Sequence, residues 1–314
     1  MPPITTRRFM KTAATLFAGI VLAACSKTEP PPAPVVVAPP PPPVVAPAKV
    51  YVVGTDAAYA PFESQNEKGE IVGFDIDVVK AIAAKASMEV KFVNTPWEGI
   101  FNALGQGDRD FLVSAVTITD ERKQTMDFSD PYFDAAQLIA VKNTSKVSKF
   151  DDLKKLKVGV QTGTTGDEAI SKLQGKTNPN IRRFESTPLA LKELEAGGVD
   201  AVVADNGVVI HYVNNNAGAN FKTVADATFT PEQYGLPVKK GNTELLAKLN
   251  KGLADIKADG TYGKIYAQYF GAAPAAGGAA TATPATPAAM TTVSTPATPA
   301  AMTTAPTPAT PASK

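Results

Sequence analysis

Several side chains in the first half of the chain have the chemistry needed to hold a small zwitterion. A carboxylate, Asp56, and an aromatic ring, Tyr59, follow an apolar run that begins at Val50. A second apolar run is followed by Arg122 and by the hydroxyl-bearing residues Ser114, Thr117 and Thr119. A guanidinium forks onto a carboxylate, and a carboxylate accepts hydrogen bonds from an ammonium. The set therefore predicts a receptor for a ligand with both charges.

Arg122 has two interpretations. Thr119 is a suitable N-cap, so Arg122 falls in the first turn of a helix, where the helix dipole disfavours a cation. Either it pairs with Asp120 or Glu121, or its guanidinium holds a ligand carboxylate, with Thr117 and nearby N–H groups beside it.

Asp205 and a glycine-containing loop are expected at the edge of a second sheet. Asp205 follows the apolar run Ala201–Val203 and either caps the next helix or accepts a ligand ammonium. The loop Gly163–Gly166 lies between a predicted strand and helix, where free N–H groups bind anions. It lacks the lysine of a P-loop, which argues against nucleotide binding.

Asp56, Tyr59 and Trp97 could surround the ligand's side chain. Asp56 either faces a polar or cationic side-chain end or caps the turn before Pro61. Tyr59 and Trp97 could sandwich that side chain, although Trp97 also has the spacing of a core face together with Ile100, Phe101 and Leu104.

The elements that must position these residues follow an α/β pattern. Short apolar runs alternate with helical periodicity from Val50 to Gly271, and the alternation restarts after Lys157, which predicts two lobes. Ligands of such folds bind outside the carboxyl ends of the strands. The expected strands are 50–53, 90–93, 111–116, 158–160, 181–184 and 201–203, and the expected helices are 76–86, 97–104, 167–173 and 188–196.

Composition argues against several classes of function. The chain has 314 residues, 44% of them hydrophobic, with a net charge of +1 that offers no basic excess for nucleic acid. One cysteine and one histidine, His211, are too few for an internal disulfide or an ordinary zinc site. We expect no metal and no cofactor, and we interpret His211 as a surface or core residue.

The N-terminus has the pattern of an export signal, residues 1–24. Arg7, Arg8 and Lys11 precede the apolar stretch Ala13–Ala24, which is too short to span a bilayer as a helix. The end of that stretch resembles a bacterial lipobox, which predicts cleavage before Cys25 and a lipid on it; the alternative is an ordinary signal in which Cys25 is incidental. The twin arginine could also direct folded export.

Both flanks of the α/β region are compositionally biased. Residues 25–49 are rich in proline and predict a semi-rigid spacer from the membrane. Residues 272–314 repeat an Ala/Thr/Pro motif and predict a disordered tail; a ligand for a proline-binding partner and an O-glycosylated stalk are alternatives.

Four motifs, taken in order, carry a resemblance to a known family. They are G-T-D-A-A-Y-A-P-F-E from Gly54, G-F-D-I-D from Gly73, T-I-T-D-E-R-K from Thr117 and D-F-S-D-P-Y-F from Asp127, with D-G-T-Y-G-K-I-Y-A-Q-Y-F near the end. They resemble the bacterial extracellular solute-binding proteins of family 3, the polar amino-acid receptors of ABC importers. The resemblance implies a type II periplasmic binding fold in the α/β class, with lobe 1 at 50–133 and 233–271, lobe 2 at 134–232, and crossovers near Phe133 and Glu232.

The resemblance also implies roles for individual residues. Arg122, with Thr117 and Thr165, would hold the ligand's α-carboxylate, and Asp205 its α-ammonium. Tyr59 and Trp97 match the family's two aromatic residues, and Asp56 matches the position at the side-chain end. Ser114 and Ala115 occupy a loop that carries serine or glycine in other members. Gln161 stands where glutamine receptors have lysine and Ala204 where they have histidine, which favours a basic ligand.

The implied function is a monomeric, lipid-anchored receptor at the periplasm or cell surface. It would close its lobes on a free basic amino acid and deliver it to the permease subunits of an ABC transporter in the inner membrane. Glutamine is the alternative ligand. Alternatives of other classes are a dehydratase-like enzyme, with Glu63 or Glu98 as general acid, and a surface adhesin or sensor.

Overall fold

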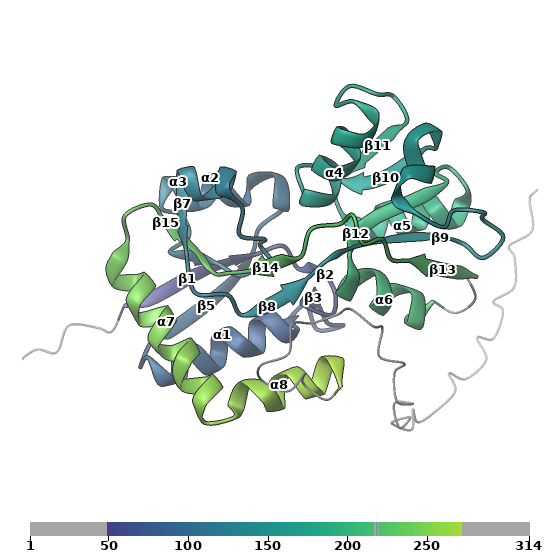
Figure 1. Cartoon of the computed structure of the whole chain (residues 1–314). Helices are drawn as coiled ribbons and strands as arrows, with labels where there is room; N and C mark the ends of the chain where they lie inside the picture. The colour runs from purple at the N-terminus through teal and green to yellow at the C-terminus, as the bar shows by residue number, and fades with distance from the viewer. Residues whose placement is uncertain (1–48, 217, 219, 272–314) are drawn as a thin grey trace, which may run out of the picture. The chain divides into compact units, whose positions relative to one another are not determined.

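The computed structural model describes residues 49–216, 218 and 220–271, all of which belong to one compact unit. The predicted signal, Cys25, the proline-rich spacer and the repeat tail lie outside the described residues. Figure 1 shows two α/β lobes in this part of the chain.

The first lobe is built on a five-stranded sheet. Strand β1 pairs in parallel with β5 and β6, whereas β15 returns late in the chain to pair antiparallel with β6 and β7. The chain therefore leaves this lobe and comes back to it. The strands in spatial order are β5 (Glu89–Asn94), β1 (Val50–Thr55), β6 (Phe111–Leu112), β15 (Pro237–Lys239) and β7 (Met126–Phe128).

The second lobe repeats the arrangement. Strand β10 pairs in parallel with β11 and β12, and β9 pairs antiparallel with β12 and β13. The strands in spatial order are β11 (Ile181–Phe184), β10 (Val158–Gln161), β12 (Ala201–Asp205), β9 (Gln137–Lys142) and β13 (Phe221–Val224).

Helices cover both sheets. In the first lobe they are α1 (Phe74–Lys85), α2 (Trp97–Gln106), α3 (Asp120–Thr125), α7 (Thr243–Ala258) and α8 (Thr261–Phe270), and a small sheet comprises β2 (Ala58–Tyr59), β3 (Glu63–Gln65) and β4 (Ile71–Val72). In the second lobe they are η1 (Phe150–Lys155), α4 (Thr165–Gln174), α5 (Thr187–Ala196) and α6 (Asn206–Asn215).

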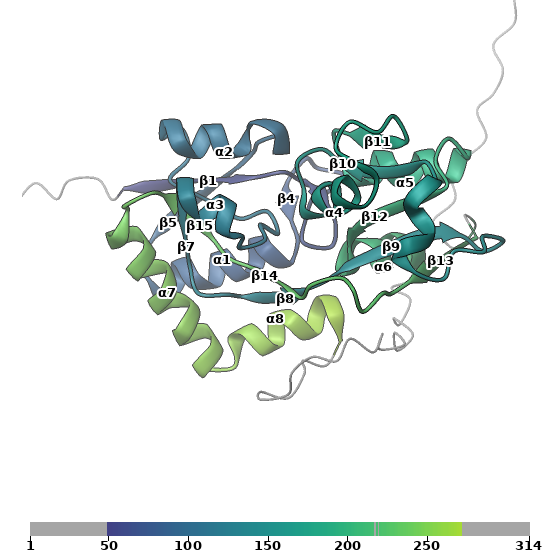
Figure 2. The same ribbon diagram turned by 45° about the horizontal axis from the view of Figure 1, so that its top comes forward.

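Two paired strands connect the lobes. β8 (Phe133–Ala135) carries the chain out of the first lobe, and β14 (Glu232–Tyr234) carries it back in antiparallel register with β8. The two strands run side by side between the lobes in both views (Figures 1 and 2). They coincide with the crossovers expected near Phe133 and Glu232. We propose 50–133 with 233–271, and 134–232, as the boundaries of the lobes.

Each lobe has its own apolar core. In the first lobe, α1 and α7 pack together on the sheet through buried side chains such as Val79, Ile82 and Leu249. In the second lobe, α4 and α5 pack on the sheet through Ile170 and Leu191, which belong to separate clusters. The alternation of short apolar strands with helices that the sequence predicted is present in both lobes.

The expected strand 111–116 is too long. The ladder ends at Leu112, although Val113 and Val116 are fully buried. Ala115 adopts a left-handed conformation, with φ of 46°, that a β-strand does not accommodate. The chain therefore turns here, at the carboxyl end of the sheet.

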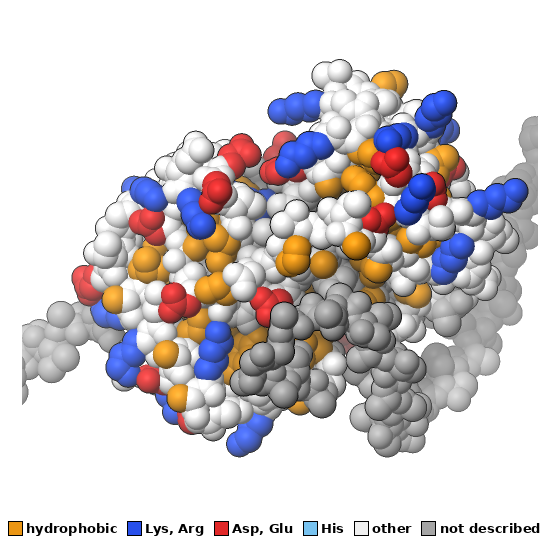
Figure 3. All heavy atoms as spheres, viewed as in Figure 1, with side chains coloured by type: hydrophobic (Ala, Val, Ile, Leu, Met, Phe, Trp, Pro, Cys, Tyr) orange, Lys and Arg blue, Asp and Glu red, His pale blue; other side chains and the backbone are white. Residues whose placement is uncertain are grey.

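Charged side chains of both signs are spread over both lobes on the face in Figure 3. In the part of the chain that the structure describes, no helix is long and apolar enough to cross a membrane.

Candidate ligand-binding site

One cavity between the lobes gathers every predicted ligand-binding side chain. The empty space inside it, which includes open solvent, is about 330 Å³. Its lining comprises Asp56, Tyr59, Trp97, Ser114, Ala115, Thr117, Arg122, Gln161, Thr164, Thr165 and Asp205. Only Thr164 was not predicted from the sequence.

Arg122 lies in the first turn of α3, as predicted. The Thr119 hydroxyl caps this helix by accepting a hydrogen bond from the Arg122 N–H at 3.1 Å. The guanidinium donates to the carbonyl oxygens of Thr117 at 3.0 Å and of Gly163, across the cavity, at 3.4 Å. Among the described ion pairs, Asp120 contacts Lys123 and not Arg122. Burial lowers the pKa of Arg122, and a carboxylate ligand would supply the anion that this buried cation lacks.

The N-terminus of α4 faces the same region. Its first N–H groups have no i−4 carbonyl to bond, so Thr165 and Gly166 present donors suited to an anion. Gly166 packs so closely that a Cβ would lie 2.8 Å from Gln137 Oε1 and 3.0 Å from the Val203 carbonyl oxygen. A side chain here would push the helix N-terminus away from β12.

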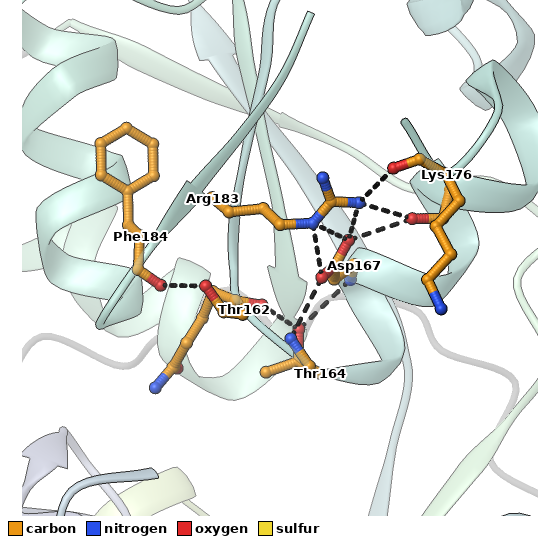
Figure 4. Close-up of polar contacts among 9 residues, drawn as sticks. Thr162, Thr164, Asp167, Lys176, Arg183 and Phe184 are labelled. Carbon is orange, nitrogen blue, oxygen red and sulfur yellow. Dashed lines mark hydrogen bonds and ion pairs between the residues drawn. The ribbon is translucent and has the colours of Figure 1, made fainter. Parts of the chain in front are cut away.

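An ion pair behind the cavity fixes the loop that leads into α4 (Figure 4). Arg183 Nε donates to both carboxylate oxygens of Asp167 at 3.0 and 2.9 Å. Asp167 in turn accepts the Gly163 N–H at 3.1 Å, and its own N–H bonds the Thr164 hydroxyl at 3.2 Å. The loop is therefore preorganised by side chains of the second lobe.

Asp205 ends β12 at the N-cap position of α6, but its side chain makes no capping bond. Its carboxylate instead accepts hydrogen bonds from Tyr59 at 2.9 Å, from Tyr234 at 2.5 Å and from Gln137. The capping interpretation is therefore wrong. Burial raises the pKa of Asp205 despite these donors, as expected for a carboxylate enclosed with little solvent.

Glu232 is a second carboxylate beside the cavity, and its role was not predicted. It accepts the Thr117 hydroxyl at 2.7 Å, the Thr165 hydroxyl at 3.0 Å and the Gln137 amide at 3.1 Å. Each hydroxyl has only one hydrogen. While Glu232 is ionised, Thr117 and Thr165 donate that hydrogen to it, so their oxygens can only accept hydrogen bonds from other groups. A ligand carboxylate would then rely on Arg122 and backbone N–H groups.

Sequence reasoning missed Gln137, Glu232 and Tyr234 as well as Thr164. Gln137 begins β9, just after β8, and Glu232 begins β14, so they are far apart in the sequence, and the pairing of β8 with β14 brings them together. The position of Glu232 at an expected crossover was the one available signal.

Asp56 and Gln161 meet across the cavity. Gln161 Nε2 donates to Asp56 Oδ2 at 3.3 Å and to the Glu185 carbonyl oxygen at 3.0 Å, while its own oxygen accepts the Thr187 hydroxyl. Burial is the main cause that raises the pKa of Asp56. The Asp56 side chain is turned into the cavity and does not cap the turn before Pro61, where the Ala58 N–H bonds the Asp56 carbonyl oxygen.

Trp97 lines the cavity and also packs against the core. Its ring centroid lies 5.3 Å from the Arg122 guanidinium carbon, as does that of Phe101, within cation–π range. Trp97 also packs on the cluster that contains Ile100 and Leu104.

The residues considered for other chemistry lie elsewhere. Glu98 is exposed on α2 and Glu63 is fully buried, and neither lines the cavity. His211 on α6 contacts Asn215, and burial lowers its pKa. Within the described residues, no cluster of His, Cys, Asp and Glu could hold a metal ion.

Known proteins share this sequence and fold. The chain is 50% identical over 227 residues to a probable histidine-binding protein of Neisseria gonorrhoeae, with 71% of this chain and 84% of that protein covered. It is 45% identical to the arginine-, lysine-, histidine-binding protein ArtJ of Geobacillus stearothermophilus, with a TM-score of 0.70 and coverage of 72% of this chain and 97% of that one. An ancestral amino acid-binding protein, described as a precursor of cyclohexadienyl dehydratase, is 42% identical with a TM-score of 0.64, covering 70% of this chain and 95% of its own.

The expected fold class is confirmed by these likenesses and by the two lobes with their paired connecting strands. The sequence model of the bacterial extracellular solute-binding proteins, family 3, matches residues 51–272. This match covers more than half of the chain, and the chain belongs to that family.

Proposed function

We propose that this protein captures a free basic amino acid in the cavity between its lobes and delivers it to the permease subunits of an ABC transporter. Arg122 and the N–H groups of Thr165 and Gly166 hold the α-carboxylate. Asp205 holds the α-ammonium. Asp56 faces the cationic end of the side chain, which lies between Tyr59 and Trp97.

The charge of the cavity is the observation that carries the choice of ligand. The charged groups in its lining are two carboxylates, Asp56 and Asp205, and one guanidinium, Arg122. A ligand with one carboxylate and two cationic groups, such as arginine or lysine, would place an opposite charge beside each of these three groups. A neutral amino acid such as glutamine would leave Asp56 buried without a cation, which is costly. The similar proteins of Neisseria gonorrhoeae and Geobacillus stearothermophilus are described as binding histidine and as binding arginine, lysine and histidine, respectively.

Contacts between the lobes support capture by closure. Tyr59 bonds Asp205, Asp56 bonds Gln161, and Arg122 bonds the Gly163 carbonyl oxygen, each across the two lobes. A ligand that touches both members of such pairs stabilises the closed arrangement over the open one.

An enzyme of the dehydratase type has less support. The dehydratase precursor that the chain resembles is itself an amino acid-binding protein. A general acid must reach the substrate, and the two candidates, Glu63 and Glu98, are outside the cavity lining. We therefore propose a binding protein and not an enzyme.

For the cellular context, we propose a monomer held at the membrane by a lipid on Cys25, with residues 25–49 as the spacer. Residues 272–314 are proposed as a flexible tail.

Isothermal titration of the purified chain with the twenty amino acids, after removal of any retained ligand, tests the proposed function. We expect arginine, lysine or histidine to bind most tightly. Binding of glutamine or glutamate in preference to all three would contradict it.

A further inference from the structure

Two fully buried carboxyl groups lie behind one wall of the cavity without lining it. Glu63 is on β3 and Asp75 is the second residue of α1, and each has a relative exposure of 0%. The two residues are neighbours, because the Asp75 N–H donates to the Phe62 carbonyl oxygen, next to Glu63, at 3.0 Å, and their side chains bond the adjacent residues Ser114 and Ala115. No described ion pair provides a lysine, arginine or histidine partner for either of them.

The partners of the four oxygen atoms show where a proton is needed. Glu63 Oε1 accepts the Ser114 hydroxyl at 3.0 Å, and Asp75 Oδ2 accepts the Ala115 N–H at 2.8 Å and the Tyr132 hydroxyl at 2.7 Å. Glu63 Oε2 and Asp75 Oδ1 are buried and find no donor among the described residues. A single proton shared by these two oxygens would give each of them a hydrogen-bond partner. It would also leave the pair with one negative charge in place of two adjacent buried charges.

The groups that face the pair carry no positive charge. They are Asp56 from the loop after β1, Tyr59 of β2, Tyr132 before β8 and Tyr262 of α8. The pKa of each tyrosine is raised, chiefly by burial, so these phenols stay neutral over the range in which carboxyl groups titrate. Burial and the neighbouring Asp75 raise the pKa of Glu63, which makes Glu63 the proton carrier.

The pair holds the turn that forms the cavity wall. Ala115 has a left-handed φ of 46°, unusual for a residue with a side chain, and its N–H is anchored on Asp75. The Ser114 hydroxyl donates to Glu63 and accepts the Asp56 N–H at 3.0 Å. One chain of bonds therefore runs from the carboxyl pair through Ser114 to the backbone of Asp56.

We propose that Glu63 and Asp75 share one proton and together act as positioning residues for the Ser114–Ala115 wall, so that removing this proton weakens both the fold and ligand binding. The effect on binding rests on the function proposed above, whereas the shared proton and its effect on stability do not.

The test compares wild type with Glu63→Gln and Glu63→Ala. A glutamine amide reproduces the neutral, donating member of the pair: its oxygen accepts from Ser114 and its N–H donates to Asp75 at every pH. A carboxyl whose pKa is raised by folding adds stability that is present at low pH and is lost as the pH rises through the folded-state pKa. The melting temperature of the ligand-free protein should therefore fall more steeply in wild type than in Glu63→Gln as the pH rises above 4.5, the ordinary pKa of glutamate, by at least about 3 °C in total.

Binding provides the second readout. At neutral pH, Glu63→Ala should weaken arginine binding by about tenfold or more, and Glu63→Gln should restore it. Above neutral pH the ratio of the affinities of wild type and Glu63→Gln should decline, since titration of arginine itself affects both proteins alike.

Three results would overturn the proposal. They are parallel melting profiles for wild type and Glu63→Gln, a Glu63→Gln variant as unstable as Glu63→Ala, and a ¹³C NMR carboxyl titration in which Glu63 ionises at or below 4.5, the ordinary pKa of glutamate. The melting and NMR readouts need no ligand, so they separate failure of this proposal from failure of the proposed function.

Discussion

The hydroxyl of Tyr59 on the first lobe donates a hydrogen bond of 2.9 Å to the carboxylate of Asp205 on the second. Tyr234, on the connecting strand β14, donates to the same oxygen at 2.5 Å. Asp205 is therefore the point at which both lobes and the connection between them meet. Binding of a ligand ammonium at Asp205 would therefore depend on the closed arrangement, because opening the lobes would remove the hydrogen bond from Tyr59.

Replacing Arg122 by alanine should abolish binding of amino acids while the protein remains folded. The guanidinium is buried at the cavity and makes no ion pair among the described residues, so a ligand carboxylate would be its anion. Loss of a forked charge-assisted contact costs about 2–4 kcal/mol, or more than about 30-fold in affinity. Calorimetry measures the affinity and circular dichroism the fold. Arg182→Ala, which removes an exposed arginine of β11, is the matched control.

Replacing Asp205 by asparagine should weaken the binding of every amino acid by a similar factor. All of them carry the α-ammonium, and an amide keeps the shape of the site while it loses the charge. The expected loss is at least about 1.5–3 kcal/mol, measured by calorimetry with several ligands. Asp151→Asn, at an exposed aspartate of η1, is the control. A loss confined to one side-chain type would contradict the assigned role.

Affinity for arginine should fall as the pH is lowered from neutral, and the fall should begin above pH 3.8, the ordinary pKa of aspartate. Burial raises the pKa of both Asp56 and Asp205, and a cation binds only their ionised forms. The effect of pH on the stability of the ligand-free protein has the opposite sign. A raised folded-state pKa adds stability at low pH, and this stability is lost as the pH rises. Titration calorimetry between pH 4.5 and 8 checks this, and Asp56→Asn should flatten the profile. An affinity that stays constant over this range would contradict it.

Most of the fold could be predicted because periodicity reflects burial directly. The strand at Ile181–Phe184 was predicted to the residue, and helix α5 to within one residue. The strand predicted at 111–116 was too long because Val113 and Val116 are as apolar as strand residues. These two valines are buried in a turn and not in a strand. The turn depends on the left-handed conformation of Ala115, which the pattern of apolar residues does not encode.

The predicted site residues lie together because most of them follow the carboxyl ends of strands or begin helices, and these edges of the two lobes' sheets border one cavity. Glu232 and Gln137 escaped prediction because their roles depend on contacts between segments far apart in the chain. The proximity of Glu63 and Asp75 was not predicted for the same reason, because β3 and α1 meet only in the folded lobe.

Replacing Cys25 by alanine should yield a product that is exported but not attached to the membrane. Cys25 lies outside the described residues, and this prediction depends on the lipobox pattern alone. Labelled palmitate should be incorporated into the wild-type protein and not into the variant. Labelling of the variant, or an unlabelled wild type, would refute the anchor. Ser26→Ala, at the next residue, is the control and should keep the label.

The most direct test of the central claim, that the cavity binds a cationic side chain, compares arginine with citrulline. Citrulline has nearly the shape of arginine but a neutral side-chain end. Calorimetry on wild type should show arginine binding at least about 10-fold more tightly, since a charge-assisted hydrogen bond to Asp56 contributes about 1.5–3 kcal/mol. In Asp56→Asn most of this preference should vanish. Equal or tighter binding of citrulline or glutamine by the wild-type protein would contradict the account.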